Sequence, residues 1–287
     1  LDVFTSEPPA EDCPLRNHPK ILTTPHLGAS TVEGQKAVSI IAIENALTYL
    51  RGEGVKGAVN AGGYRVDLSD RQKQYVDLAD RMASLLSPIC TRGIAKVSIE
   101  INGKELKAAS GTIERIVLMA LLKSSTETPV NVINVSGIAQ SRGMEVTSKL
   151  SDEKSRGECL AIRVKGPEGS VTKDTHPADV DRHIVGRIFE DNRPRVLEIN
   201  GYYMDMVPAG NMMLIRNQDK PGIIGLVGNT MGDAGVNIAD MAISRRDNTA
   251  LMVLKVDEVP SDELVAKLKA NDAILHVSSV QLPAEKA

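Results

Sequence analysis

The amino-acid sequence predicts a mixed α/β and α+β protein in three parts, and three observations lead to this fold class. Two capping-box patterns, Ser30 with Glu33 and Ser69 with Gln72, each open a segment that has apolar residues at helical spacing. Residues 97–101 alternate strictly between apolar and polar, which is typical of a half-buried strand. The final segment has the order strand–helix–strand–strand–helix–strand, which is that of a ferredoxin-like unit.

The first part is expected to cover residues 1–60. Short strands are expected at 1–4 and 21–22, and a helix that starts after Ser30 is expected to continue to about Leu50. Glycines follow this helix at once, and glycine readily adopts the left-handed conformation that is needed past a helix end. The glycines therefore predict the end of the helix and a linker to the next part.

The linker matches the sequence pattern of a nucleotide-binding loop, but it lacks the structural context that such a loop needs. Residues 52–57 read Gly-Glu-Gly-Val-Lys-Gly, which matches G-x-G-x-x-G. A dinucleotide fingerprint follows a strand and opens a helix, because the pyrophosphate sits on the helix N-terminus. Here Gly52 and Gly54 are expected to end a helix, which offers carbonyl groups instead. No cofactor-binding residue is therefore predicted in this chain.

The middle part is expected to be a separate α+β domain over residues 65–205. Helices are expected at about 69–86 and 112–122, and strands at 97–101, 130–135, 144–150 and 159–164.

The last part is expected to be the ferredoxin-like unit, over residues 211–287. Its strands are expected at 212–215, 238–244, 250–256 and 274–282, and its helices at 222–232 and 261–268.

Composition narrows the function classes. The net charge is −3, and only 2% of the residues are aromatic, so a basic nucleic-acid surface and stacking of bases are not expected. No apolar stretch reaches bilayer length, which argues against a membrane protein. Cys13, Cys90 and Cys159 follow no metal or redox spacing, which favours a reduced, cytoplasmic protein without a metal site. Because Leu1 already opens an apolar strand pattern, we expect the chain to be a piece of a longer protein.

A candidate catalytic residue lies in the run Thr-Pro-His-Leu-Gly-Ala-Ser-Thr at residues 24–31. His26 is predicted on a tight turn between a strand and a helix, where its imidazole can exchange protons. Its ordinary pKa of about 6.5 suits acid–base work near neutral pH. The alternative is that His26 is only a turn residue near a helix cap.

The residues around His26 resemble those of the D-2-hydroxyacid dehydrogenase family. The resemblance includes Leu-Asp-Val-Phe at 1–4, Glu-Pro-Pro at 7–9, Leu15 and the run at 24–31. It implies that this part is the tail of a Rossmann-type dehydrogenase that uses NAD, and that His26 is the general acid/base. The family pairs this His with a Glu and holds the substrate with an Arg. Both are expected before Leu1, and Glu7 is expected to be a solvated surface residue.

A candidate binding site lies in Asn-Gln-Asp-Lys-Pro-Gly at residues 217–222, together with Asn237. The Pro-Gly turn is expected to expose helix N–H groups that attract a carboxylate. Asp219 offers an acceptor for an ammonium group, and Asn217 and Asn237 carry amides that donate and accept. We expect the helix in between to return the chain to the same end of the sheet. The alternative is ordinary loop chemistry.

The order of the three parts resembles the long-form phosphoglycerate dehydrogenases, in which an intervening domain precedes an ACT domain. The resemblance implies oxidation of 3-phosphoglycerate with NAD in serine biosynthesis. It also implies that L-serine is an allosteric effector that binds between two ACT domains of a homo-oligomer, through Asn217, Asp219 and Asn237. In the family the intervening domain can bind an anionic ligand, and basic residues such as arginine suit such a ligand. An ordinary solvated face is the favoured interpretation of each basic residue of the middle part, so none is assigned to a ligand: Arg142, Lys149, Arg163, Arg187, Arg193 and Arg195.

The resemblance thus implies that the chain is the C-terminal part of an NAD-dependent phosphoglycerate dehydrogenase with serine-sensing domains. Because the chain has His26 but no nucleotide-binding core, we expect it to be inactive by itself. The alternative is a non-catalytic regulatory protein that binds an amino acid through its last domain. The dehydrogenase-like residues 1–50 argue against that alternative.

Overall fold

The computed structural model describes residues 1–51, 55–58, 61–65, 67–90, 93–123, 125–126, 129–167 and 181–285. The chain divides into two compact units, residues 1–60 and 61–287. Gly52 and Gly54, which were predicted to end the first helix, lie outside the described residues. Among the described helices, none combines the length and the apolar character that a bilayer crossing needs.

In the described residues of the first unit there is one helix, α1 (Val32–Leu50), with an irregular segment before it. The predicted capping box of Ser30 and Glu33 is wrong, because the cap lies one residue later. Thr31 accepts a hydrogen bond from the backbone N–H of Gly34, whereas the N–H of Ser30 is used in the preceding turn, where it donates to the Leu27 carbonyl.

The strands predicted at 1–4 and 21–22 are also wrong. The two segments do lie together, because Thr24 N–H donates to the Leu1 carbonyl at 3.0 Å and His26 N–H donates to the Asp2 carbonyl at 3.1 Å. These bonds do not continue into a ladder, so both segments remain irregular.

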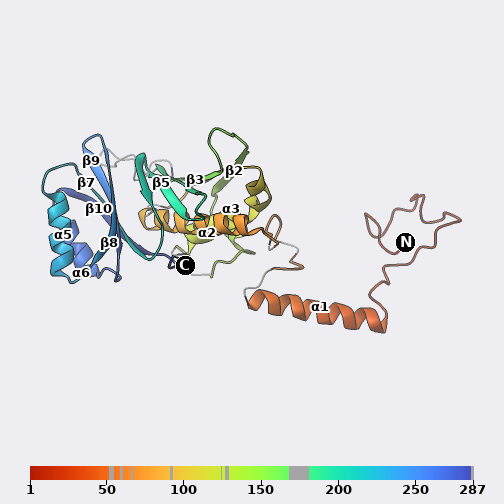
Figure 1. The fold of residues 1–287 in the computed structure, drawn as a ribbon. Helices are drawn as coiled ribbons and strands as arrows, with labels where there is room; N and C mark the ends of the chain where they lie inside the picture. The colour runs from red at the N-terminus through yellow and green to blue at the C-terminus, as the bar shows by residue number, and fades with distance from the viewer. Residues whose placement is uncertain are drawn as a thin grey trace. The chain divides into compact units, whose positions relative to one another are not determined.

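The second unit begins with a six-stranded sheet in the order β2-β1-β3-β4-β5-β6, in which β1 runs parallel to β2 and antiparallel to β3 (Figure 1). The strands are β1 (Lys96–Asn102), β2 (Glu145–Ser151), β3 (Cys159–Lys165), β4 (Asp181–Ile188), β5 (Pro194–Ile199) and β6 (Tyr202–Met206). The helices are α2 (Asp70–Leu86), α3 (Ser110–Leu122) and α4 (Val135–Ser141), with short 3₁₀ turns η1 (Ser87–Ile89) and η2 (Glu105–Ala109).

Local sequence signals explain most of this sheet. The capping box of Ser69 and Gln72 forms as predicted and opens α2. In β1 the side chains of Val97, Ile99 and Ile101 are fully buried against the helices, as the alternation indicated. The predictions for α2, β1, α3, β2 and β3 are thus confirmed.

The strand predicted at 130–135 is wrong, because asparagine side chains fold this segment into a turn. The Asn131 carboxamide oxygen accepts the N–H groups of Ile133 and Asn134, and that of Asn134 accepts the N–H of Asn131. Backbone groups that a strand would offer to a neighbour are therefore bonded locally, and α4 begins at Val135.

The unit ends in a four-stranded antiparallel sheet with the order β10-β7-β9-β8. Its elements are β7 (Asn211–Gln218), α5 (Ile223–Asp233), β8 (Ile238–Arg246), β9 (Thr249–Val256), α6 (Asp262–Lys269) and β10 (Ile274–Gln281), and they confirm the predicted ferredoxin-like order. Figure 1 shows α5 and α6 side by side on one face of this sheet.

The two faces of the second sheet serve different cores. Met213 and Ile215 of β7 point to α5 and α6. Met212 and Leu214, on the opposite face because side chains alternate along a strand, belong to the core of the first sheet. The ferredoxin-like module therefore shares its apolar core with the domain before it.

A joint, formed by residues 207–210 and 282–285, leads the chain into and out of the second sheet. Its two segments pair, since Leu282 N–H donates to the Gly210 carbonyl at 2.9 Å and Gly210 N–H donates to the Pro283 carbonyl at 3.3 Å. The entry and the exit of the module are thus held together.

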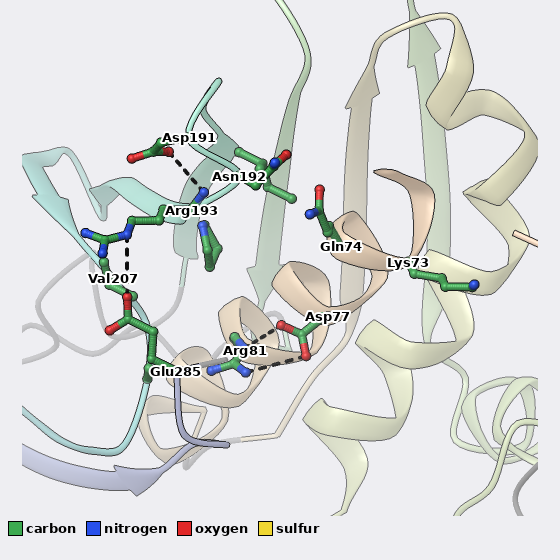
Figure 2. Close-up of a pocket in the computed structure, with 12 residues that line it drawn as sticks. Lys73, Gln74, Asp77, Arg81, Asp191, Asn192, Arg193, Val207 and Glu285 are labelled. Atoms are coloured by element: carbon green, nitrogen blue, oxygen red, sulfur yellow. Dashed lines mark hydrogen bonds and ion pairs between the residues drawn. The ribbon is translucent and has the colours of Figure 1, made fainter. Parts of the chain in front are cut away.

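Arg81 of α2 fastens this joint to the first domain. Its side chain is only 2% exposed and donates to the carbonyl groups of Pro208, Pro283 and Ala284, at 2.9, 2.7 and 3.3 Å. Asp77, one helical turn earlier, balances its charge with a contact of 2.7 Å from Oδ2 to Nε (Figure 2). A buried guanidinium with these partners rigidifies the contact between the domains.

We predict that Arg81→Met lowers the free energy of unfolding by roughly 3 kcal/mol, because three carbonyl groups and Asp77 lose their buried charged partner. Urea unfolding followed by circular dichroism measures the change. Arg65→Met is the control: Arg65 forms an exposed pair with Asp67, which contributes about 0.5 kcal/mol or less. Equal losses for the two variants would contradict the assigned role of Arg81.

Candidate functional site

Asp2 organises the turn that carries His26. Its carboxylate accepts hydrogen bonds from the Thr24 hydroxyl at 2.5 Å and from the N–H groups of Leu27 and Gly28 at 2.7 and 2.6 Å. The Thr24 hydroxyl is the main cause that lowers the pKa of the Asp2 carboxyl. His26 itself has a φ of 56°, a backbone conformation that non-glycine residues seldom adopt. The three bonds to Asp2 hold the chain in this conformation.

Glu7 lies on the surface, as expected, but it is also the carboxylate partner of His26, a contact that the sequence did not indicate. Its Oε2 lies 2.7 Å from His26 Nδ1. The hydrogen bond with Glu7 raises the pKa of the His26 imidazole. The pKa of Glu7 is lowered, mainly by the N–H of Phe4 and then by His26. With Nδ1 engaged by Glu7, Nε2 is the ring nitrogen that is available for proton exchange.

A cavity of about 340 Å³ opens beside this pair. Glu7, Arg16, Thr24 and His26 all line it. It therefore combines an acid/base pair with a cation and a hydroxyl, groups that suit a small polar anion.

The second candidate site lies where β7 ends and α5 begins. Asn217 is only 3% exposed, and among the described residues its buried side-chain oxygen has no hydrogen-bond partner. Gly222 caps α5 with a φ of 89°, and space is open where side chains at Gly222 and Gly225 would lie. An open helix start beside an unsatisfied buried acceptor is suited to a ligand that carries both a carboxylate and hydrogen-bond donors.

Asp219 has two links to the β8–β9 turn. Its backbone N–H donates to the Asn248 carbonyl at 2.9 Å. Its carboxylate Oδ1 lies 3.3 Å from Nε of Arg245, near the end of β8. The acceptor proposed for an ammonium group thus already has a cationic partner in the protein.

Asn237 lies at the opposite end of the sheet, so the expectation that α5 returns the chain to the same end is wrong. Gln218 pairs with Thr249 at one end of β9, and Ile238 pairs with Val256 at the other. These positions are seven residues apart along the strand, or about 24 Å. Asn237 instead donates to Asp257 at 2.8 Å. Within one module, no amino acid can contact both Asp219 and Asn237.

The edge strand β8 and the adjoining helix expose apolar side chains. Ile224 of α5 is 51% exposed, and Met241 and Ile243 of β8 are 39% and 37% exposed. Met241 and Ile243 pair with Leu254 and Met252, so they lie on the helix side of the sheet. An uncovered apolar strip along a free sheet edge is typical of an interface.

The basic residues of the middle domain are dispersed among local partners. Arg142 bonds to Ser125, Arg163 pairs with Asp181, Arg187 lies over the Phe189 ring, Arg193 faces Glu285 and Arg195 pairs with Asp205. Arg193 also lines a cavity of about 620 Å³ between α2, the β4–β5 turn and the joint (Figure 2). Gln74 and Asn192 line the same cavity from its two sides.

Comparisons with known proteins agree with both domains. The model of the D-3-phosphoglycerate dehydrogenase intervening domain matches residues 71–200, and that of the ACT domain matches residues 212–273.

Curated relatives are similar along nearly the whole chain. D-3-phosphoglycerate dehydrogenase of Bacillus subtilis is 32% identical over 286 residues, which cover 99% of this chain and 52% of that protein. The enzyme of Methanocaldococcus jannaschii is 31% identical, covering 98% and 52%. That of Mycobacterium tuberculosis is 30% identical, covering 95% and 50%. The chain spans about half the length of these relatives. With that family's intervening domain followed by an ACT domain, the chain belongs to the D-3-phosphoglycerate dehydrogenase family.

Proposed function

We propose that this chain is the regulatory part of an NAD-dependent dehydrogenase that oxidises 3-phosphoglycerate to 3-phosphohydroxypyruvate for serine biosynthesis. The family of the chain supports this reaction. In the proposed division, residues 1–60 complete the catalytic region, residues 65–205 form the intervening domain and residues 211–287 form the ACT domain. By itself the chain is proposed to have no dehydrogenase activity. The whole protein is proposed to be cytoplasmic.

In this proposal His26 is the general acid/base and Glu7 its positioning partner. Glu7 fixes the imidazole through Nδ1, and its charge stabilises the protonated ring, so that Nε2 exchanges a proton with the substrate hydroxyl. NAD supplies hydride acceptance when bound. In the sequence the glycines at 52–57 come after α1, whereas a pyrophosphate site needs such glycines between a strand and the start of a helix. No contact with NAD is therefore assigned to this chain.

The apolar surface of α1 also supports a place within a larger fold. None of its side chains is buried, and Val38, Ile41 and Ile43 are each more than half exposed. A helix with apolar residues all round is normally buried by other parts of a protein.

For the ACT domain we propose that L-serine binds between two copies. If two β8 edges pair across a two-fold axis, they run antiparallel, so the start of one strand faces the end of the other. Asn237 precedes the start of β8, and Asp219 is bonded to Arg245 near its end. Pairing through Met241 and Ile243 would therefore bring Asn237 of one copy to Asp219 of the other.

The observation that carries this site is the open start of α5 with the unsatisfied oxygen of Asn217 beside it. The helix N-terminus attracts the ligand carboxylate, and Asp219 takes the ammonium group. Asn237 of the second copy completes the site.

We predict that Asp219→Ala weakens L-serine binding by roughly ten- to a hundredfold, because a charge-assisted hydrogen bond of about 1.5–3 kcal/mol is lost. Isothermal titration calorimetry measures the affinity. Lys220→Ala, a change at the adjacent exposed position, is the matched control and should alter the affinity by less than about twofold. Serine binding that is indifferent to Asp219→Ala would place the site elsewhere.

A site shared by two copies also predicts complementation. Asp219→Ala and Asn237→Ala chains should each bind L-serine weakly, because every site loses one contact. After refolding as a 1:1 mixture, about a quarter of all sites combine two intact faces and should regain full affinity. Calorimetric titration of the mixture counts these sites. Unmixed samples of each variant are the controls, and a mixture that behaves as their average contradicts the shared site.

The stability of the turn that carries His26 should depend on pH. Because Glu7 raises the pKa of His26, the ion pair stabilises the turn most between about pH 4.5 and pH 6.5, where the imidazole is protonated and Glu7 is ionised. This contribution is lost as pH rises through the raised pKa of His26, and again as pH falls through the lowered pKa of Glu7. Glu7→Gln should return the pKa to its ordinary value. Proton NMR of the imidazole against pH measures it, with Glu11→Gln in the same loop as the control. An unchanged His26 pKa in Glu7→Gln would disprove the pairing.

A further inference from the structure

The last two residues of β8, Arg245 and Arg246, lie on opposite faces of the second sheet. Arg245 pairs with Ala250 and Arg246 with Thr249. Because side chains alternate along a strand, Arg245 shares the helix side of the sheet with Ile243, and Arg246 points to the other side. The other side is the one that packs on the intervening domain.

Arg246 contacts the two-residue turn between β5 and β6. Its Nη1 donates to the Asn200 carbonyl at 3.0 Å. Asn200 and Gly201 have φ values of 53° and 84°, as this type of hairpin turn requires. The guanidinium lies directly over Gly201, where an added β-carbon would collide with Nη1. The turn is thus shaped to receive the arginine.

The β5–β6 turn is in turn fixed to the centre of the first sheet. Asn200 N–H donates to the His183 carbonyl at 2.7 Å, and the Asn200 side-chain oxygen accepts the His183 N–H at 2.8 Å. A second link joins the domains nearby, between the Tyr202 and Thr249 hydroxyls at 2.6 Å. A shift of Arg246 therefore acts on β4 through Asn200.

Arg245 reaches the opposite way, to the amino-acid site. Its Nε lies 3.3 Å from the carboxylate of Asp219, and the Asp219 N–H is bonded to Asn248 in the β8–β9 turn. An ammonium group that binds Asp219 competes with Arg245 for one carboxylate. Displacing Arg245 removes the side-chain link between the end of β8 and the ligand loop, so that only the backbone bond to Asn248 joins them.

We propose that the Arg245–Arg246 pair couples the amino-acid site of the ACT domain to the intervening domain. The ligand ammonium replaces the Arg245 guanidinium at Asp219, the end of β8 moves, and Arg246 loosens its hold on Asn200. This coupling rests on the proposed function in its use of an amino-acid ligand. The contacts that carry it are independent of the ligand, so it can be tested without one.

The ligand-free test removes the carboxylate that holds Arg245. Hydrogen exchange of the segment 199–203, measured by mass spectrometry, should be about fivefold faster in Asp219→Ala than in the unchanged chain, a modest coupling between sites. With Arg246→Gln as the background, the same Asp219→Ala change should have no effect on this segment. Arg65→Gln, on an exposed pair elsewhere, is the matched control background and should preserve the effect.

The ligand test uses L-serine and calorimetry together with exchange. L-serine should speed exchange at 199–203 in the unchanged chain, and should still bind Arg246→Gln without changing exchange there. Arg245→Gln should bind L-serine more tightly, because the competing cation is gone.

The coupling is overturned if Asp219→Ala leaves 199–203 unchanged, or if Arg246→Gln keeps the response. It is also overturned if Arg245→Gln binds L-serine more weakly. Absence of serine binding together with an Asp219→Ala response that needs Arg246 would reject the proposed ligand and support the coupling.

Discussion

The apolar core that the two sheets of the second unit share is the constraint on which the rest of the structure depends. Met212 and Leu214 of β7 and Leu251 and Val253 of β9 pack with the same cluster that contains Tyr202, Met206 and the helices of the first domain. A ferredoxin-like sheet often leaves this face to solvent or to another chain. Here it is covered from within the chain, so the ACT module cannot turn freely against the intervening domain. The polar contacts between the two domains therefore have fixed partners. Examples are the hydrogen bonds of Arg81 to the Pro208 carbonyl and of Arg246 to the Asn200 carbonyl.

Sequence patterns predicted the elements whose inward positions are uniformly apolar. Strand β9 belongs to this group, because its buried positions are all apolar, and in β1 the same holds for Val97, Ile99 and Ile101. In β4 the inward positions are Arg182, Ile184, Gly186 and Ile188. Of these four residues, only Ile184 and Ile188 have apolar side chains. Gly186 is required there because a β-carbon would lie 2.7 Å from the sulfur of Met82. A buried arginine and a close-packed glycine thus conceal a central strand from pattern analysis.

The candidate sites were harder to predict, because their geometry depends on chain direction and on contacts between distant residues. A helix that connects two parallel strands carries the chain back to the end at which the first strand began. Asn237 therefore lies near Asn211, where β7 starts, and both side chains bond to Asp257. In the proposed dimer, it is the Asn237 of the second copy that would come close to Asp219. The Glu7–His26 contact was missed for a related reason: the two residues are 19 positions apart in the sequence, and no periodic signal relates them.

Strand β8 combines three roles that are usually carried by separate elements. It is a free edge of the sheet with exposed Met241 and Ile243, it provides the counter-ion of Asp219, and it contacts the intervening domain through Arg246. In the proposed dimer, pairing of two β8 strands would fix the same residues that the ligand must displace. Association and ligand binding would then oppose each other at Arg245 but support each other at Asn237. Whether ligand binding strengthens or weakens the dimer depends on which contact is stronger, the one at Arg245 or the one at Asn237. The contact at Arg245 is the weaker one, because Arg245 is 72% exposed and its ion pair with Asp219 is screened by solvent. Ligand binding is therefore expected to tighten the dimer while it releases the intervening domain.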